Sequence, residues 1–310
     1  MDQFVLMEKE IHVDRERWLS RSLKNEPAVN NQDGQIPCLD QHKNSVVNSV
    51  FELASGCLHT ASVDRKLEST QHASELLARG QIDFSGGGEP LPITATVFPV
   101  FPELVDPRQL PRRSVGSENG RVALLHALAH IEFYAIHLAW DIVYRFRGLP
   151  AGFYKGWLEV AVEESMHFSL LCRRLGQLGA QYGDLPAHRG LWDIATDTCD
   201  DLLARLALVP RTMEARGLDV TPGMIEKLSK VGDERSVAIL QRILADEVGH
   251  VALGSRWFKK VCYERGLDPV TSYIEFVQRF LKGKIRRPIN HALRRQAGFD
   301  EQELKKLELL

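Results

Sequence analysis

Apolar residues recur three or four positions apart along most of the chain from residue 120 onwards, which is typical of helices with one buried face. Shorter patterns of the same kind cover 221–233, where Thr221 and Pro222 suit a helix start, and 270–281. No alternating strand pattern of useful length appears after residue 120. We therefore expect an all-α fold, most simply a four-helix bundle with short extra helices. The four long patterns cover residues 121–146, 153–183, 193–217 and about 234–265.

The chain before residue 120 has a different character. Apolar residues at helical spacing predict one helix within 45–61 and a second, short one within 71–80 that ends at Gly80. Six prolines lie between Pro90 and Pro111, so we expect this segment to run extended across the surface of a domain.

These differences predict a chain of four parts. The expected parts are a polar N-terminal extension (1–35), a helical and then Pro-rich segment that packs on the bundle (36–119), the four-helix bundle (120–265) and a C-terminal helical tail (266–310).

Composition narrows the class of protein. The chain has 310 residues, 44% of them hydrophobic, so it can bury a substantial core. Its net charge of −2 gives no global basic field that would favour nucleic acid as a partner. The five cysteines are scattered and form no CxxC pair, which indicates neither a disulfide framework nor a thiolate zinc site. With neither a signal-peptide pattern nor an uncharged apolar stretch of about 18 residues, we expect a soluble, cytoplasmic protein and no membrane partner.

Each long helical pattern carries one carboxylate among its inward-facing apolar residues, and two patterns add a histidine one turn further on. Charged side chains are rarely buried without a partner, so this arrangement requires an explanation. The residues are Glu132, Glu164, Glu214 and Glu247, with His167 following Glu164 and His250 following Glu247.

The second and fourth patterns also repeat one another. The segment EESMHFSLLCR (163–173) aligns with DEVGHVALGSR (246–256), so that an acid, Glu, His, an apolar residue, Leu and Arg recur in register. The preceding Glu lies 32 residues before Glu164 in one half and 33 before Glu247 in the other. Two copies of an antiparallel helical hairpin would give this spacing, with the first turn centred at Gly148.

A metal centre explains these residues best. A single Glu–His pair is often a structural hydrogen bond, but four carboxylates gathered in one core are strongly unfavourable unless cations or protons neutralise them. Four carboxylates and two imidazoles without a thiolate suit two divalent first-row metals rather than a structural zinc.

The arrangement resembles that of the ferritin-like superfamily, in which two helices each give a Glu and two others each give a Glu-x-x-His motif. The phrases LLHALAHIE, GDLPAH, RLALVP, EARGLDVTP and DEVGHVALG further resemble an uncharacterised bacterial ferritin-like family. The resemblance covers most of 120–265 and implies a centre of two iron ions, with manganese as the alternative. It implies that Glu164 and Glu247 bridge the metals, Glu132 and Glu214 are terminal ligands, and His167 and His250 each bind one metal.

Three functions remain open at this point. We favour a di-iron oxidoreductase, an oxidase or hydroxylase that activates O₂ towards an unknown organic substrate with an unknown electron donor. Its distant analogue is the di-iron hydroxylase that modifies isopentenylated adenosine in tRNA. The alternatives are an iron-handling or peroxide-reducing protein and a metal-stapled, non-enzymatic interaction module. Catalytic residues beyond the metal ligands are unknown at this stage, and a homodimer is a further expectation.

Several neighbouring features carry secondary predictions. Pro210 and Gly217 flank Glu214, so we expect the third helix to be kinked or short. We expect His126, His130 and His137 to be packing or solvated residues rather than groups that support the ligands or relay protons, and Glu163 and Asp246 to pair with arginines or partner helices rather than bind metal. The basic stretch 282–295 suits a solvated tail helix, with phosphate or RNA binding as the alternative.

Overall fold

The computed structural model describes residues 48–86, 88–90, 98–110 and 114–310, and nearly all of its regular structure is helical. Within these ranges the strands are two-residue segments, β1 (Asn48–Ser49) and β2 (Ile82–Asp83), which pair in parallel. The prediction of an all-α fold is confirmed. The expected extension 1–35 lies outside the described residues.

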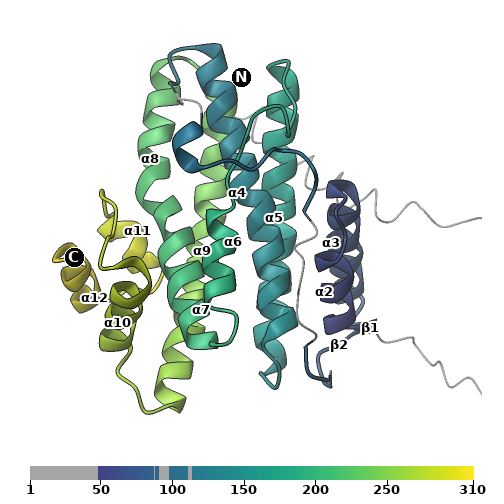
Figure 1. Cartoon of the computed structure of the whole chain (residues 1–310), viewed down its shortest axis with the longest axis vertical. Helices are drawn as coiled ribbons and strands as arrows, with labels where there is room; N and C mark the ends of the chain where they lie inside the picture. Colours follow the sequence, from purple (N-terminus) through teal and green to yellow (C-terminus); the bar gives the residue numbers. More distant parts are fainter. Residues whose placement is uncertain (1–47, 87, 91–97, 111–113) are drawn as a thin grey trace, which may run out of the picture.

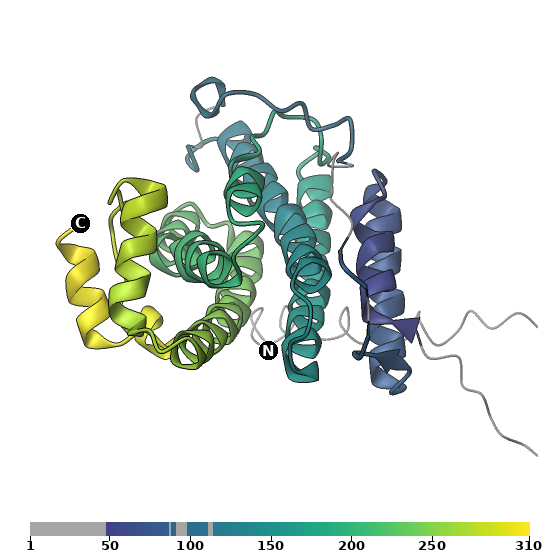
Figure 2. The same cartoon turned by 60° about the horizontal axis from the view of Figure 1, so that its bottom comes forward.

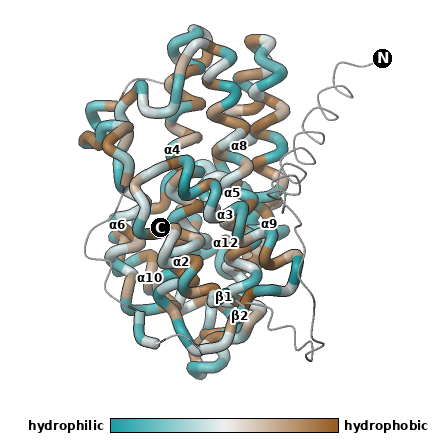
Figure 3. The backbone as a smooth tube through the Cα atoms, turned by 90° about the vertical axis from the view of Figure 1, so that its right-hand side faces the viewer, coloured by the Kyte–Doolittle hydropathy of each residue, from teal (hydrophilic) through white to brown (hydrophobic). Residues whose placement is uncertain are grey.

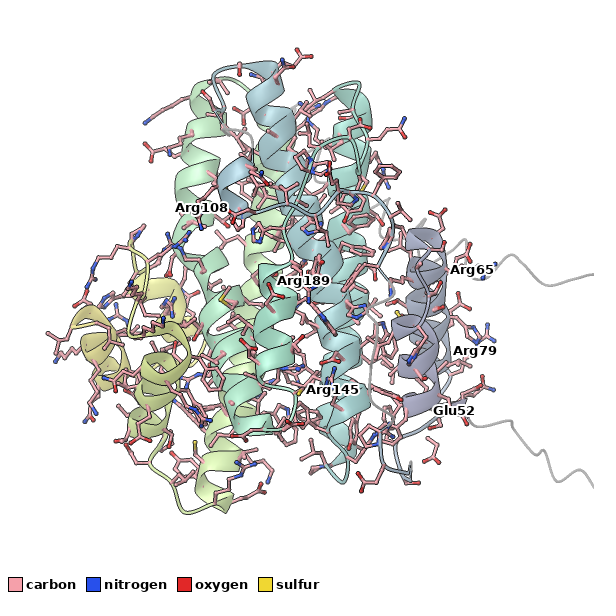
Figure 4. The ribbon with its side chains drawn as sticks, viewed as in Figure 1. Glu52, Arg65, Arg79, Arg108, Arg145 and Arg189 are labelled. Carbon is pink, nitrogen blue, oxygen red and sulfur yellow. The ribbon has the colours of Figure 1, made fainter. Side chains whose placement is uncertain are left out.

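Three groups of helices lie side by side in both orientations shown (Figures 1 and 2). The N-terminal pair, α2 (Val50–Leu58) and α3 (Val63–Ala78), packs on one side of the central helices, and the C-terminal helices pack on the other. Figure 4 shows that Glu52, Arg65 and Arg79 of the N-terminal region point away from the centre. Helix α3 begins eight residues earlier than predicted (63 against 71), because the Ser62 hydroxyl accepts a hydrogen bond from the Arg65 amide and caps it.

The central helices include α4 (Glu118–Arg145), α5 (Ala151–Gln177) and α9 (Glu234–Glu264). Helix α4 packs on α5 and α5 on α9. The turn between α4 and α5 contains Gly148 with φ of 70°, a conformation that favours glycine. Hydrophobic and hydrophilic positions are mixed along α5 and α9 (Figure 3), as expected for helices with one buried face, whereas α4 is buried on most sides.

The predicted boundaries of the third helix, 193–217, were wrong. The chain instead forms α6 (Gly190–Asp197), α7 (Leu202–Leu208), a π-helix η2 (Val209–Glu214) and α8 (Ala215–Lys230), which packs along α9. The break before α7 is stabilised by Asp201, whose carboxylate accepts a hydrogen bond from the Leu203 amide. No new helix starts at Pro222, because α8 continues through it and buries Leu218 and Leu228.

The distortion that the sequence predicted near Pro210 is present, and it is the π-helix η2. Pro210 has no N–H to donate, so the helix loses one backbone hydrogen bond here, and the turn closes with the wider π-helical pattern. The Thr212 hydroxyl donates to the Ala207 carbonyl at 2.8 Å, and the Ala215 amide bonds the Pro210 carbonyl five residues back. Opposite, Gly254 of α9 lets the proline approach closely, since a Cβ there would lie 2.5 Å from Pro210 Cβ.

The C-terminal part consists of α10 (Pro269–Leu281), α11 (His291–Gln296) and α12 (Glu301–Glu308). These helices pack on α7, α8 and α9. The buried Arg211 of η2 donates to the Glu303 carboxylate of α12 at 2.6 Å, which ties this region to the central helices.

The described part of the Pro-rich segment runs extended, as predicted, except for a short 3-10 turn, η1 (Pro107–Gln109). Its backbone pairs with Ala187, whose amide donates to Glu103 and whose carbonyl accepts from Val105. Residues 91–97 and 111–113 of this segment lie outside the described residues.

Among the described helices, α4 is the one long and apolar enough to cross a membrane, but 83% of its apolar window is buried within the molecule. Burial of this kind is typical of a core helix.

Candidate metal centre

Four buried side chains from three central helices meet in one group. Glu132 of α4, Glu164 and His167 of α5 and Glu247 of α9 each offer one ligand atom, and these atoms lie within 4.8 Å of one another. The group can therefore hold a metal ion. We refer to these four residues as the carboxylate cluster.

Glu164 lies between both histidines. Its Oε2 is 3.3 Å from His167 Nδ1, and its Oε1 is 3.0 Å from Nδ1 of His250. His167 Nδ1 also lies 3.2 Å from Glu132 Oε2, and His250 Nδ1 lies 3.5 Å from Glu247 Oε1. Both imidazoles therefore present Nδ1 to the carboxylates at the centre.

The other nitrogen of each imidazole contacts an acid on the opposite helix. His167 Nε2 of α5 is 3.1 Å from Asp246 of α9, and His250 Nε2 of α9 is 2.8 Å from Glu163 of α5. Asp246 also accepts from Arg242 Nε at 2.6 Å. In metal sites such contacts fix the ring orientation and keep the remaining nitrogen available for the ion. The sequence shows two acids at equivalent repeat positions, but not that they pair crosswise.

Glu214 reaches the same region from the end of η2, but it does not belong to the carboxylate cluster. Glu214 as a whole is half-buried, but its Oε2 atom is buried and has no hydrogen-bond partner. Burial raises its pKa well above the ordinary value, and the nearby Glu247 and Glu164 carboxylates raise it further. Glu214 also lines a cavity of about 140 Å³ together with Glu132 and Glu247.

The buried carboxylates of the centre repel one another, and their pKa values reflect this repulsion. Burial, followed by repulsion from Glu164, raises the pKa of Glu132 to about 8. Burial and Glu247 act to raise the pKa of Glu164, but His167 and His250 outweigh them, and it stays below its ordinary value. Burial also acts to lower the pKa values of both histidines, but the carboxylates around them raise both well above the ordinary value.

The donor atoms fit a bound cation. Glu214 Oε2 is buried without a hydrogen-bond partner, and the buried atoms Glu164 Oε1 and His250 Nδ1 lie 3.0 Å apart but not in hydrogen-bonding geometry. Buried polar atoms without a partner are rare and costly, and a metal ion would supply the missing interaction. The set contains only oxygen and nitrogen donors, and the four described cysteines are free thiols outside it.

The three other histidines of α4 serve packing and loop attachment. The His130 ring contacts the Tyr182 hydroxyl and the His188 carbonyl, each at 3.0 Å, and His126 Nε2 accepts from the Gly183 amide. His137 is buried against the Lys66 ammonium of α3, 3.3 Å away. None of the three belongs to the carboxylate cluster.

Comparison with known proteins places the chain in a family. Residues 59–305 match a family described as "Protein of unknown function (DUF455)". A protein of Haemophilus influenzae, described as uncharacterized, is 46% identical over 214 residues, which cover 67% of this chain and 74% of that protein. No solved structure matches the chain.

Proposed function

Because the chain belongs to the DUF455 family, whose description assigns no activity, we propose a function from the buried centre itself. The protein is a ferritin-like di-iron carboxylate oxidoreductase of the cytoplasm that oxidises or hydroxylates an organic substrate with O₂. The observation that carries this proposal is the crosswise arrangement in which both histidines direct Nδ1 to Glu164 and Nε2 to an outer acid.

The arrangement supports a role for each of the six residues expected from the sequence. Glu164 has one oxygen facing each histidine, which suits a carboxylate that bridges two ions, and Glu247 is its repeat partner on α9. His167 and His250 would each bind one ion. Glu132 and Glu214 remain as terminal ligands, one from α4 and one from η2. A Glu from each of two helical elements and a Glu-x-x-His from each of the other two is the ferritin-like ligand set.

The surroundings favour chemistry at the centre over a purely structural role. Two iron ions would supply the electrons that reduce O₂. The inner cavity, the 140 Å³ space against Glu132, Glu214 and Glu247, leaves room for a small molecule beside the carboxylates. Its remaining walls are largely apolar, including Leu128 and Leu240, and such walls exclude water from reactive species.

The proposal is tested by metal analysis of protein purified from iron-supplemented cells. We expect close to two irons per chain and a fast change in visible absorbance when the reduced protein is mixed with O₂. Absence of iron, or iron that does not react with O₂, would contradict the oxidoreductase.

Substitution of Glu164 by Gln should abolish stoichiometric metal binding, since an amide cannot supply the negative charge that a bridging ligand provides. The matched control is Glu159→Gln on the same helix, where the glutamate is exposed and pairs only loosely with Lys155 at 4.0 Å. Metal content of both variants is measured by elemental analysis. Two irons retained in Glu164→Gln would eliminate the bridging role.

A further inference from the structure

A second, larger cavity adjoins the inner one. It has a volume of about 720 Å³, within the range that binds organic molecules of moderate size. Its walls include residues of η1, α4, α6, η2, α8, α11 and the segment that joins α10 to α11. We call it the outer cavity.

The two cavities share part of their lining. Ile131, Leu191, Met213 and Arg216 line both of them. Three of these residues are apolar, so an apolar group in the outer cavity would lie against the wall of the inner one.

The outer cavity is strongly basic. Among the described residues that line it there is no Asp or Glu, whereas four carry a positive charge, Arg216, Lys284, Arg286 and Arg294. The last three come from the basic stretch 282–295, for which the sequence favoured a solvated tail helix. In the structure α11 is only six residues long, and part of the stretch forms a cavity wall instead.

Nearby carboxylates do not neutralise this charge. The Asp219 carboxylate accepts two hydrogen bonds from Arg294, at 2.7 and 2.9 Å, and lies 3.6 Å from Arg216. Two guanidinium groups thus share one carboxylate, and Arg216 also donates to the backbone carbonyls of Arg286, Arg287 and Pro288, which leaves Lys284 and Arg286 as the available charges. Within the described chain, Lys284 and Arg286 form no ion pair, and the Nη1 atom of the buried Arg294 has no hydrogen-bond partner.

We propose that the outer cavity binds an amphipathic organic anion, with a phosphate or carboxylate head group held by the basic wall. Arginine and lysine bind such oxyanions through charge-assisted hydrogen bonds. The apolar body of the anion lies against Ile131, Leu191 and Met213. That this anion is the substrate rests on the proposed function of the metal centre. Binding of the anion to the outer cavity does not depend on that function.

The test is calorimetric titration of the full chain with octyl phosphate, octanoate, octanol and inorganic phosphate. We expect one of the two amphipathic anions to bind most tightly, which identifies the head group, and octanol and inorganic phosphate to bind at least about tenfold more weakly. Equal binding of octanol would overturn recognition of the anion. Equal binding of inorganic phosphate would overturn recognition of the apolar body.

Charge variants separate this site from general surface attraction. The double variant Lys284→Gln/Arg286→Gln should weaken binding of the preferred anion roughly tenfold or more. The control Lys282→Gln/Lys305→Gln removes the same charge from exposed positions that do not line the cavity, and should bind like the wild type. Equal losses in both double variants, or none in either, would overturn the proposal.

Metal content is measured on the same samples. We expect it to be unchanged in both double variants, because none of these residues contacts the carboxylate cluster. Charge-dependent anion binding in a wild-type protein without metal would reject the proposed function and retain the anion site. Two irons together with unselective binding would reject the anion site alone.

Discussion

The two outer acids show how single residues prepare the metal centre. Asp246 and Glu163 each hold Nε2 of a histidine on the opposite helix, so Nδ1 of each ring faces the carboxylates. Asp246 is itself held by Arg242, one turn away. A chain of contacts from the helix surface therefore sets the orientation of His167.

Substitution of Asp246 by Asn should lower metal affinity by roughly 10- to 100-fold, because the amide gives a weaker and less directed partner for His167. Competition with a chelator measures the affinity, and circular dichroism checks that the fold is retained. The control is Glu264→Gln, which removes an exposed acid of α9 that also pairs with a basic residue one turn away. Unchanged affinity in Asp246→Asn would show that the ring orientation is set by packing alone.

Sequence patterns predicted that the six expected residues lie in one region. The helical period determines which positions share a helix face, and the repeat spacing determines which positions lie at the same level along the bundle axis. They did not identify the crosswise contacts of Asp246 and Glu163, which depend on how α5 and α9 cross. They also failed to show that Arg286 and Arg294 line one cavity. That depends on a loop path between α10 and α11 that no short-range pattern specifies.

At the scale of elements, the π-helix η2 depends on the close approach of Pro210 to Gly254. Pro210 removes one backbone hydrogen bond from the helix, and the sequence predicted a distortion at this point. The sequence did not predict that α8 continues through Pro222. The helix continues there because burial of its apolar face against α9 outweighs the loss of the one backbone hydrogen bond that proline removes.

Substitution of Gly254 by Ala should destabilise the protein by a few kcal/mol, on the order of 1–3, since the new Cβ would lie 2.5 Å from Pro210 Cβ. We also expect lower metal content, because η2 carries Glu214. Gly249→Ala on the same helix meets no atom within 4 Å, so it should be neutral or stabilise by up to about 1 kcal/mol. Chemical denaturation compares the two; similar stabilities would mean that η2 can shift without cost.

At the scale of the whole molecule, the C-terminal helices are fastened to the centre through Arg211. Its guanidinium lies 4.4 to 4.5 Å from the ring centroids of Phe258, Tyr273 and Phe299 and donates to Glu303 of α12. Both partners of this ion pair are fully buried. Residues at the end of the chain therefore support the element that carries Glu214.

Substitution of Glu303 by Gln should cost about 3–5 kcal/mol of unfolding free energy, because it leaves the buried Arg211 charge without its counter-ion. The neighbouring pair Arg295–Glu301 is half exposed, and Glu301→Gln should cost no more than about 1 kcal/mol. Urea denaturation measures both. Equal, small losses would show that the three aromatic rings alone hold the guanidinium.

The π-helix also gives the chain between α7 and α8 one residue more than a regular helical turn needs. A π-helical turn closes with bonds from residue i+5 to residue i, and an α-helical turn with bonds from i+4 to i, so deletion of one residue between Val209 and Glu214 would let this turn close as α-helix with α8 in the same register. Insertion of one residue would instead rotate α8 by about 100° relative to α7. Met213 and Arg216 would then leave the shared cavity wall, and Glu214 would leave the carboxylates. We therefore expect this stretch to tolerate the loss of one residue better than the gain of one.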